Sequence, residues 1–171
     1  MFDRLLDFLL AFGGKFLPFT ILNSYEQGVV LRLGSYQRTI GPGYHWIIPF
    51  GVDEVFSDSC VISTARLNPQ SLTTADGTQC VVGAVITSKV SDIRKLLLEC
   101  EDKDQALIDM SFGIIASEVT KVTWDELHTE EFSEKVTKAV RKRGFRFGLE
   151  VERVQFSDLS KCRSIRLWSG V

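Results

Sequence analysis

Apolar residues recur along this chain with two different spacings, and each spacing favours one kind of element. Over residues 29–90 they form short runs or alternate with polar residues, as in β-strands, whereas over residues 93–140 they return every three or four positions, as in α-helices. Alternation resumes over residues 149–156, with a one-residue slip between Val151 and Val154 that predicts a bulge. The pattern predicts an α+β protein with a sheet, then packed helices, then a closing strand.

The segment from Tyr25 to Phe50 organises the first half of the chain. Val29–Leu33 is a short apolar run between two glycines and predicts a strand. The polar segment Ser35–Ile40 is expected to link this strand to the turn that follows. Gly41-Pro42-Gly43 favours a tight reversal, because proline restricts φ and glycine accepts positive φ. Tyr44–Ile48 predicts the return strand, which Pro49 ends. We therefore expect a β-hairpin that serves as a structural corner.

Weaker strand signals follow the corner. Val52–Ser57 predicts a weak extended segment, Ser59–Ala65 a better one, and Asn68-Pro69 a break, since the residue before proline is pushed out of the helical region. Asp76-Gly77 between strand-like runs is a strong hairpin signal. The long alternation that starts at Cys80 predicts the second strand of that hairpin, with one buried face.

Capping residues punctuate the helical part of the chain. Asp92 is positioned to cap a short helix, and Lys103–Val122 has the apolar spacing of a longer one. Thr123–Glu126 has the form of a capping box, and Thr129 is positioned to cap the next helix. Arg141–Arg143 lies at the negative end of that helix, where we expect it to compensate the dipole rather than bind a partner.

The first segment, Met1–Leu22, is the most apolar part of the chain. On a helix its few charged and small residues gather along a narrow stripe, which favours a helix in the plane of a membrane surface over a span or a cleaved signal peptide. The alternative is a terminal helix that covers the protein's own core or a neighbouring subunit. The side chains expected to contact the membrane are Phe2, Leu5, Leu6, Phe8, Leu9, Leu10, Phe12, Phe16, Leu17 and Phe19.

Composition and charge limit the classes of partner and ligand that the chain could bind. The 171 residues suffice for one domain and an attached segment. The net charge of −2, with no stretch basic enough to follow a phosphate backbone, argues against nucleic acid. The four cysteines are far apart, without the spacing of a zinc site, and Cys60 and Cys80 lie in strand-like runs that favour buried thiols. We expect no metal and no cofactor.

No catalytic motif is present in the sequence. His45 and His128 have no second ligand at metal-binding spacing, and the sequence contains no phosphate-binding loop or nucleophile elbow. A Cys60–His45 pair assembled by the fold stays open. The acidic residues outside the helices are interpreted as turn or solvated residues: Asp53, Glu54, Asp76 and Asp158.

The corner also carries a family resemblance. Glu26–Val30, Arg32–Gly34 and Gly41–Trp46, followed by Pro49, resemble the opening of the band 7 (SPFH) domain of stomatins, prohibitins, flotillins and bacterial relatives. The likeness continues in order to Leu159. The motif residues expected to have structural roles are Gln27, Gly28, Gly34, Gly41, Pro42, Gly43, Pro49, Asp76 and Gly77.

The resemblance implies a mostly antiparallel sheet and a non-enzymatic scaffold on a membrane. Residues 1–24 would be the membrane-associating segment, 25–159 the SPFH domain and 160–171 a short tail. The implied partners are membrane lipids, further copies or longer SPFH relatives in rings or cages, and membrane proteins such as proteases, with the cytoplasmic face favoured. Many relatives continue into a coiled coil that this sequence lacks, so we expect assembly through the domain itself or with a longer relative. The alternative is a small soluble adaptor or enzyme.

Overall fold

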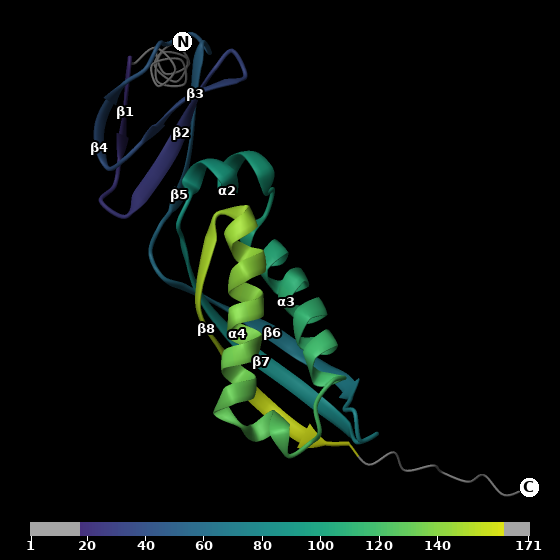
Figure 1. The fold of residues 1–171 in the computed structure, drawn as a ribbon. Helices are drawn as coiled ribbons and strands as arrows, with labels where there is room; N and C mark the ends of the chain where they lie inside the picture. The colour runs from purple at the N-terminus through teal and green to yellow at the C-terminus, as the bar shows by residue number, and fades with distance from the viewer. Residues whose placement is uncertain (1–17, 163–171) are drawn as a thin grey trace, which may run out of the picture. The chain divides into compact units, whose positions relative to one another are not determined.

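The computed structural model describes residues 18–162, which form two compact units (Figure 1). Unit 1 holds residues 18–61 together with Val90–Glu101, and unit 2 holds Ile62–Lys89 together with residues 102–162. Antiparallel strands are followed by helices and a closing strand, which confirms the α+β fold, although the strands fall into three small sheets.

Unit 1 contains five of the strands in two small sheets. β1 (Phe19–Leu22) pairs antiparallel with β4 (Gly43–Trp46). β2 (Glu26–Arg32) lies between β3 (Ser35–Ile40) and β5 (Asp53–Ser59) and pairs antiparallel with both.

The core of unit 1 is small. Val29 and Val30 are both fully buried, and because adjacent residues of a strand point to opposite faces, β2 is covered on both sides. Val30 packs in one cluster with Leu22 and Ile40, and the helix α2 (Ile93–Glu99) packs against β2 and β5. The buried apolar residues of unit 1 are Leu22, Val29, Val30, Ile40, Ile93 and Leu96.

Unit 2 consists of one sheet with helices packed on it. β7 (Gln79–Val90) is the central strand, between β6 (Ser63–Thr73) and β8 (Leu149–Lys161). The helices α3 (Lys103–Val119) and α4 (Glu130–Gly144) pack against each other, as Figure 1 shows, with α3 also against β6 and α4 against β8. Two 3₁₀ turns flank α4: η1 (Glu126–His128) and η2 (Phe145–Phe147).

The buried face of β7 matches the predicted alternation. Cys80, Val82, Ala84 and Ile86 are buried. The burial of β8 also shifts phase after Val151, as the slip in the sequence predicts. The core residues from the other elements of unit 2 are Leu67, Leu107, Ile115, Val119, Leu127, Phe132, Val136, Val140, Leu149, Val151 and Val154.

The predicted helix starts are confirmed. The carboxylate of Asp92 accepts hydrogen bonds from the first turn of α2, and the hydroxyl of Thr129 accepts one from the first turn of α4. Asp102 caps α3 in the same way, and that helix ends at Val119 rather than at the expected Val122. The capping box at Thr123 is half formed: the Glu126 carboxylate accepts from the Thr123 N–H at 2.9 Å.

The predicted corner hairpin is wrong in its pairing. β2 forms a hairpin with β3 through Leu33-Gly34, so Ser35–Ile40 is a strand and not a link, and β4 pairs with β1 instead. An edge strand that exposes most of its side chains, as β3 does, carries no apolar pattern that would mark it in the sequence. Phe19–Leu22, expected to end the apolar helix, is strand β1.

Two further strand boundaries differ from expectation. Val61 and Ile62, the expected centre of a strand, are exposed between β5 and β6. Asn68-Pro69 does not break the chain but lies inside β6, at a register shift between Leu67 and Gln70. A bulge there accommodates the proline, which cannot donate to the sheet. The Asp76-Gly77 hairpin between β6 and β7 is confirmed.

Candidate functional site

One face of the β1–β4 ladder presents aromatic and aliphatic side chains to solvent. The register places Phe19 opposite Trp46 and Ile21 opposite Tyr44, and residues two apart on a strand share a face. Ile21 is 67% exposed, Tyr44 51% and Trp46 64%. The opposite face of the ladder is not exposed in the same way, since Leu22 of β1 is buried there.

The aromatic rings on this face contact one another. The ring centroids of Phe19 and Tyr44 lie 5.2 Å apart, and those of Tyr44 and Trp46 lie 5.8 Å apart in an edge-on arrangement. Such spacings are typical of packed aromatic pairs. The face is therefore an ordered surface of rings rather than scattered exposed residues. We call Phe19, Ile21, Tyr44 and Trp46 the aromatic face.

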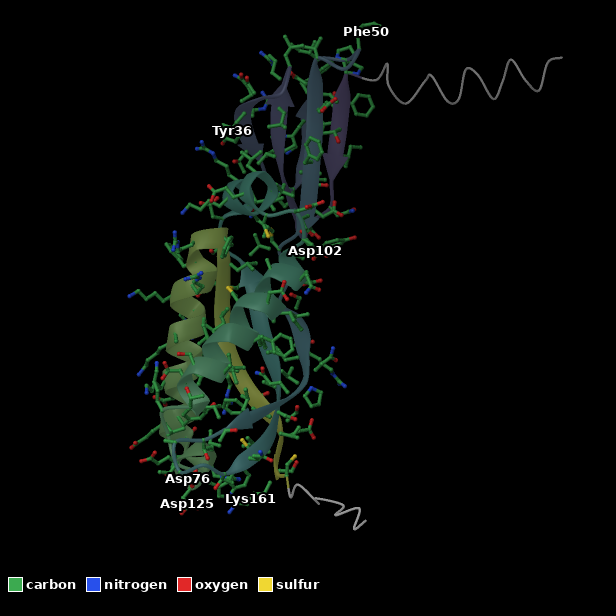
Figure 2. All side chains as sticks on the ribbon, turned by 90° about the vertical axis from the view of Figure 1, so that its right-hand side faces the viewer. Tyr36, Phe50, Asp76, Asp102, Asp125 and Lys161 are labelled. Atoms are coloured by element: carbon green, nitrogen blue, oxygen red, sulfur yellow. The ribbon has the colours of Figure 1, made fainter. Side chains whose placement is uncertain are left out.

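Two turns of unit 1 each present a bulky apolar residue in an unfavourable backbone conformation. Leu33 has φ 49° and is followed by Gly34 with φ 80°, and Phe50 has φ 68° and is followed by Gly51 with φ 76°. Leu33 is 79% exposed and Phe50 72%. The turns are neighbours, because the Leu33 N–H donates to the Val52 carbonyl at 2.8 Å. We call Leu33 and Phe50 the apolar tip; Phe50 is labelled at the end of unit 1 in Figure 2.

The apolar tip is costly for a folded protein in water. Two-residue turns with both φ values positive favour Asn-Gly or Asp-Gly, because Asn and Asp tolerate the left-handed region. An ordinary side chain in that region costs on the order of 1–2 kcal/mol. Leu and Phe also gain nothing by exposure to water. Contact with an apolar medium would offset both the backbone cost and the exposure of these two side chains.

An ion pair between Arg32 and the buried carboxylate of Asp53 holds the turn that carries Phe50. The Asp53 carboxylate accepts from Arg32 Nε at 2.8 Å and Nη2 at 3.2 Å, and from the Ile48 N–H at 2.9 Å. The side chain of Asp53 is 1% exposed. The hydrogen bonds from Arg32 are the main reason that the pKa of Asp53 lies below its ordinary value. The interpretation of Asp53 as a turn or solvated residue is therefore wrong.

The predicted membrane-associating residues from Phe2 to Leu17 lie outside the described residues. Phe19, the last of them, belongs to the aromatic face. Residues 18–162 include no helix that is long and apolar enough to cross a membrane.

The predicted motif residues scatter over both units, at turns and at one close approach between strands. A Cβ on Gly28 would lie 2.6 Å from the Phe56 carbonyl oxygen, so only glycine fits there without a shift of the strands. Gly34 and Pro49 belong to the two turns of the apolar tip, and Gln27 is exposed on β2. The others lie at the start of β4 and in the turn before β7: Gly41, Pro42, Gly43, Asp76 and Gly77.

The Asp76 carboxylate ties its turn to the segment before α4. It accepts hydrogen bonds from the Thr74 hydroxyl, from the Thr78 N–H at 3.3 Å and from the Trp124 N–H at 3.4 Å. These donors, with Thr74 the strongest, lower its pKa to about 2. The expectation of a turn residue is confirmed.

The histidines and cysteines that are candidates for chemistry lie in local structural contacts. His45 Nε2 donates to the Gly41 carbonyl at 2.7 Å, and His128 Nδ1 donates to the Trp124 carbonyl at 3.1 Å. Cys80 is buried as expected, whereas Cys60 is only half-buried and follows β5. Within residues 18–162 no three His, Cys, Asp or Glu side chains are grouped closely enough to hold a metal ion.

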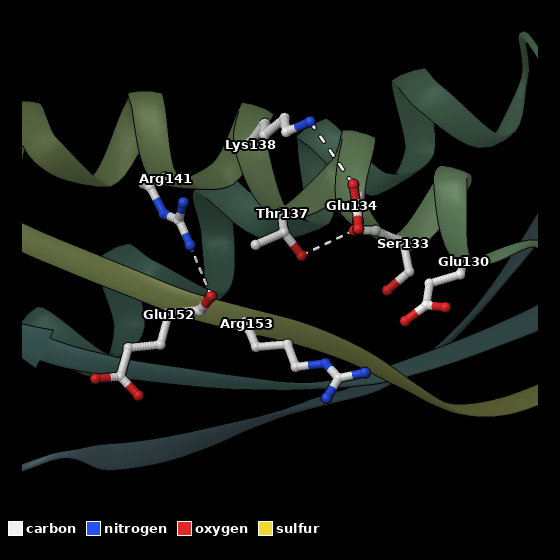
Figure 3. A pocket seen from close by; sticks show the side chains of 8 residues that line it. All are labelled: Glu130, Ser133, Glu134, Thr137, Lys138, Arg141, Glu152 and Arg153. Carbon is white, nitrogen blue, oxygen red and sulfur yellow. Dashed lines mark hydrogen bonds and ion pairs between the residues drawn. The ribbon is translucent and has the colours of Figure 1, made fainter.

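A polar hollow between α4 and β8 has a structural role (Figure 3). Ser133, Thr137 and Arg141, one turn apart on α4, bond the backbone of β8. The Ser133 hydroxyl donates to the Val154 carbonyl, the Thr137 hydroxyl accepts from the Val154 N–H, and Arg141 donates to the Val151 and Glu152 carbonyls. These α4 side chains thus occupy hydrogen-bonding groups of β8, which is an edge strand of its sheet. Arg141 does more than the dipole compensation expected for Arg141–Arg143.

Comparison with known protein families agrees with the fold. Residues 20–166 match the family model described as SPFH domain / Band 7 family. The chain belongs to this family.

Individual relatives come from archaea, an animal and a bacterium. The chain is 26% identical over 148 residues to an uncharacterised protein of Methanocaldococcus jannaschii, a match that covers 85% of this chain and 74% of that protein. It is 23% identical to "Stomatin-like protein stl-1" of Caenorhabditis elegans, with 82% of this chain and 45% of that protein covered. It is 27% identical to "Protein HflK" of Treponema pallidum, with 58% and 37% covered. The chain thus spans less than half of the two relatives whose names are informative.

Most residues of the candidate site carry no clear signal in the sequence. No sequence pattern predicted that Ile21, Tyr44 and Trp46 lie on one exposed face, or that Leu33 and Phe50 lie at exposed turns. The signal that could have found the apolar tip is a bulky residue directly before glycine between two strands, which occurs at Leu33-Gly34 and Phe50-Gly51.

Proposed function

We propose that this protein is a non-enzymatic scaffold that docks on a membrane through the aromatic face and the apolar tip of unit 1. The observation that carries the proposal is the apolar tip, where Leu33 and Phe50 are exposed in a backbone conformation that asparagine would adopt at lower cost. Family membership and the stomatin-like relative support the same role.

The chemistry of the surface suits the boundary between lipid and water. Trp and Tyr favour this boundary because each combines an apolar ring with a polar group. Leu and Phe gain about 1.5–3 kcal/mol each when fully buried in an apolar medium. The aromatic face begins at Phe19, within the end of the apolar segment Met1–Leu22 that we propose as a further membrane contact. The domain boundaries at residues 24 and 159 are part of this proposal.

We further propose that several copies, or copies with longer SPFH relatives, assemble side by side on the membrane. Such an assembly would organise membrane proteins, and membrane proteases are the proposed clients. The similarity to a protein named HflK and to a stomatin-like protein supports this part of the proposal. The absence of a grouped metal site within residues 18–162 is compatible with it but adds no support.

The test is a double substitution at the tip, Leu33→Asn with Phe50→Asn, in the full chain. Asparagine fits the left-handed backbone, so the variant should fold at least as well as the wild type. Removal of two apolar contacts should lower partition onto phosphatidylcholine–phosphatidylglycerol vesicles at least tenfold, since each contact contributes about 1.5 kcal/mol or more. Vesicle flotation over a series of lipid concentrations measures the partition coefficient.

The matched control is Val61→Asn with Ile62→Asn. These neighbours are 54% and 57% exposed and lie outside both the aromatic face and the tip, so lipid binding should stay at the wild-type level. Equal partition of the wild type and of the tip variant would refute docking through unit 1. Equal loss in the control pair would show that any exposed apolar residue serves, which also contradicts the proposal.

A further inference from the structure

A groove on unit 2 combines an apolar floor with a basic rim. It lies between α3 and α4 and has a volume of about 490 Å³. Gly113, Ile114 and Ser117 of α3 line it with Ala139 of α4, so small side chains leave the space open and Ile114 makes it apolar. The rim consists of Lys142, Arg143 and Arg146.

The rim carries positive charge that unit 2 does not neutralise. Within residues 18–162, Lys142, Arg143 and Arg146 have no carboxylate within ion-pair distance. Glu118 also lines the groove but does not neutralise these cations, because its carboxylate pairs with Lys121 at 2.7 Å and with Lys135 at 2.8 Å. The groove therefore favours an apolar side chain flanked by carboxylates.

This chain carries such a segment at the end of α2. Leu98 is 42% exposed, although Leu96 beside it is buried and anchors the helix. Glu99 and Glu101 follow, both exposed and both without a cationic partner among the residues that the structure describes. We call Leu98, Glu99 and Glu101 the acidic knob.

We propose that the acidic knob of one copy docks in the α3–α4 groove of a second copy. Leu98 would contact the floor near Ile114, and Glu99 and Glu101 would face the cations of the rim. The inference rests on the proposed assembly and names its contact. Since the two surfaces differ, each copy offers one of each, and the association is head to tail, which produces closed rings or open filaments.

The contact is small, and charge complementarity of this kind contributes more to register and partner choice than to affinity. It would be effective where many copies share one lipid surface, because attachment to the membrane raises their local concentration. Assembly should therefore be much stronger on vesicles than in detergent solution.

The first experiment is disulfide trapping of the full chain on phosphatidylcholine–phosphatidylglycerol vesicles. A chain with Leu98→Cys and Ser117→Cys together should form a ladder of covalent oligomers under mild oxidation. Each single variant reports the background from the native cysteines. A ladder that does not exceed both backgrounds overturns the proposal, and so does a cross-linked species that stays monomeric, since the contact would then lie within one chain.

The second experiment exchanges the charges. Arg143→Glu and Glu101→Arg should each lower the oligomeric fraction at least fivefold in single-particle mass measurements, and an equal mixture of the two should restore alternating assemblies. Arg153→Glu and Glu54→Arg make the same charge changes elsewhere and should assemble like the wild type. Failure of the mixture to recover, or equal loss in the controls, counts against this pairing.

Flotation of the same samples separates the two proposals. If the charge variants float like the wild type but stay monomeric, membrane docking and the knob–groove contact are both supported. If no variant changes assembly while all float, the contact is refuted and docking stands. If the chain with Leu98→Cys and Ser117→Cys forms the ladder in detergent but does not float, docking is refuted and the contact stands.

Discussion

The two units divide their apolar side chains in opposite ways. Every large apolar residue that is exposed within residues 18–162 belongs to unit 1, except Ile62 and Phe145. Most of the buried apolar residues belong to unit 2, where two helices cover a sheet. Unit 2 therefore has the core of an independent domain, whereas unit 1 keeps apolar surface that its own fold does not cover.

This difference explains why the candidate site lies on the unit with the smaller core. A surface that binds an apolar medium must stay uncovered, and the free energy that its burial would contribute is then missing from the fold. Unit 1 offsets this with directional contacts: the Asp53 cluster, and Arg38, which donates to the Trp46 carbonyl and links β3 to β4. Unit 2 has directional contacts as well, at Asp76 and between α4 and β8, beside its larger core. The predictions below test this division.

The largest expected effect is on the core of unit 2. Ile115 is fully buried on α3, and Ile115→Ala should lower the free energy of unfolding by about 3–4 kcal/mol through lost apolar contact and a cavity. Hydrogen exchange should show faster opening of unit 2 while vesicle binding stays at the wild-type level. Ser117→Ala, on the exposed side of the same helix, is the control and should change little. Equal loss of protection in unit 1 would mean that the units unfold as one.

The next effect concerns the ion pair of unit 1. Asp53→Ala removes the acceptor of Arg32 and of the Ile48 N–H, which should cost about 2–3 kcal/mol because bonds to a charged group are lost while their donors remain. Hydrogen exchange should rise in the turn at Phe50 first. Glu54→Ala, next to it and exposed, should be neutral. A stable turn in the Asp53 variant would contradict the role given to this pair.

Acid should weaken the same pair by less than the alanine substitution. The pKa of Asp53 is lower in the folded protein than its ordinary 3.8, so the stabilisation is complete above that value and is lost as the pH falls through the folded pKa. Asp76 follows the same rule in unit 2, between about pH 4 and its pKa of about 2. Unit 1 of an Asp53→Asn variant should lose this part of its acid sensitivity in an exchange experiment that follows the protein as the pH falls below 3.8.

A smaller effect is expected at the covered edge of β8. Thr137→Val keeps the shape but leaves the Val154 N–H without its acceptor, which should cost about 1–2 kcal/mol. Thr137→Ser keeps the hydroxyl and should cost clearly less. The unfolding free energy and the exchange rate of the Val154 amide measure both. Similar losses in the two variants would show that packing, not the hydrogen bond, matters at this position.

The smallest effect has the opposite sign. Leu33→Asn alone should raise the stability of unit 1 by about 0.5–1 kcal/mol, because asparagine accepts the left-handed backbone at lower cost. Leu33→Ala, which cannot hydrogen-bond its own backbone, is the control and should not give this gain. Thermal unfolding of unit 1, followed by hydrogen exchange, measures it. A destabilised asparagine variant would mean that Leu33 contributes to folding rather than to an external contact.

Local chemistry in the sequence determined the class of fold and many element ends. Asp92 and Thr129 cap helices because their side chains accept from the next turn whatever lies around them, and Asp76-Gly77 turns the chain for an equally local reason. The buried face of β7 follows from alternation alone. The ordered motif that resembles the SPFH domain is likewise a property of the sequence alone.

Only the tertiary structure decided which strands pair and therefore what the surface presents. β4 pairs with β1 rather than β2, and this pairing places Phe19 beside Tyr44 and Trp46. Strand pairing depends on contacts between distant segments, which no local pattern specifies. The same is true of Asp53, whose burial depends on Arg32 lying 21 residues earlier in the sequence. Residue types determined the elements, and long-range pairing decided which of their side chains remain exposed.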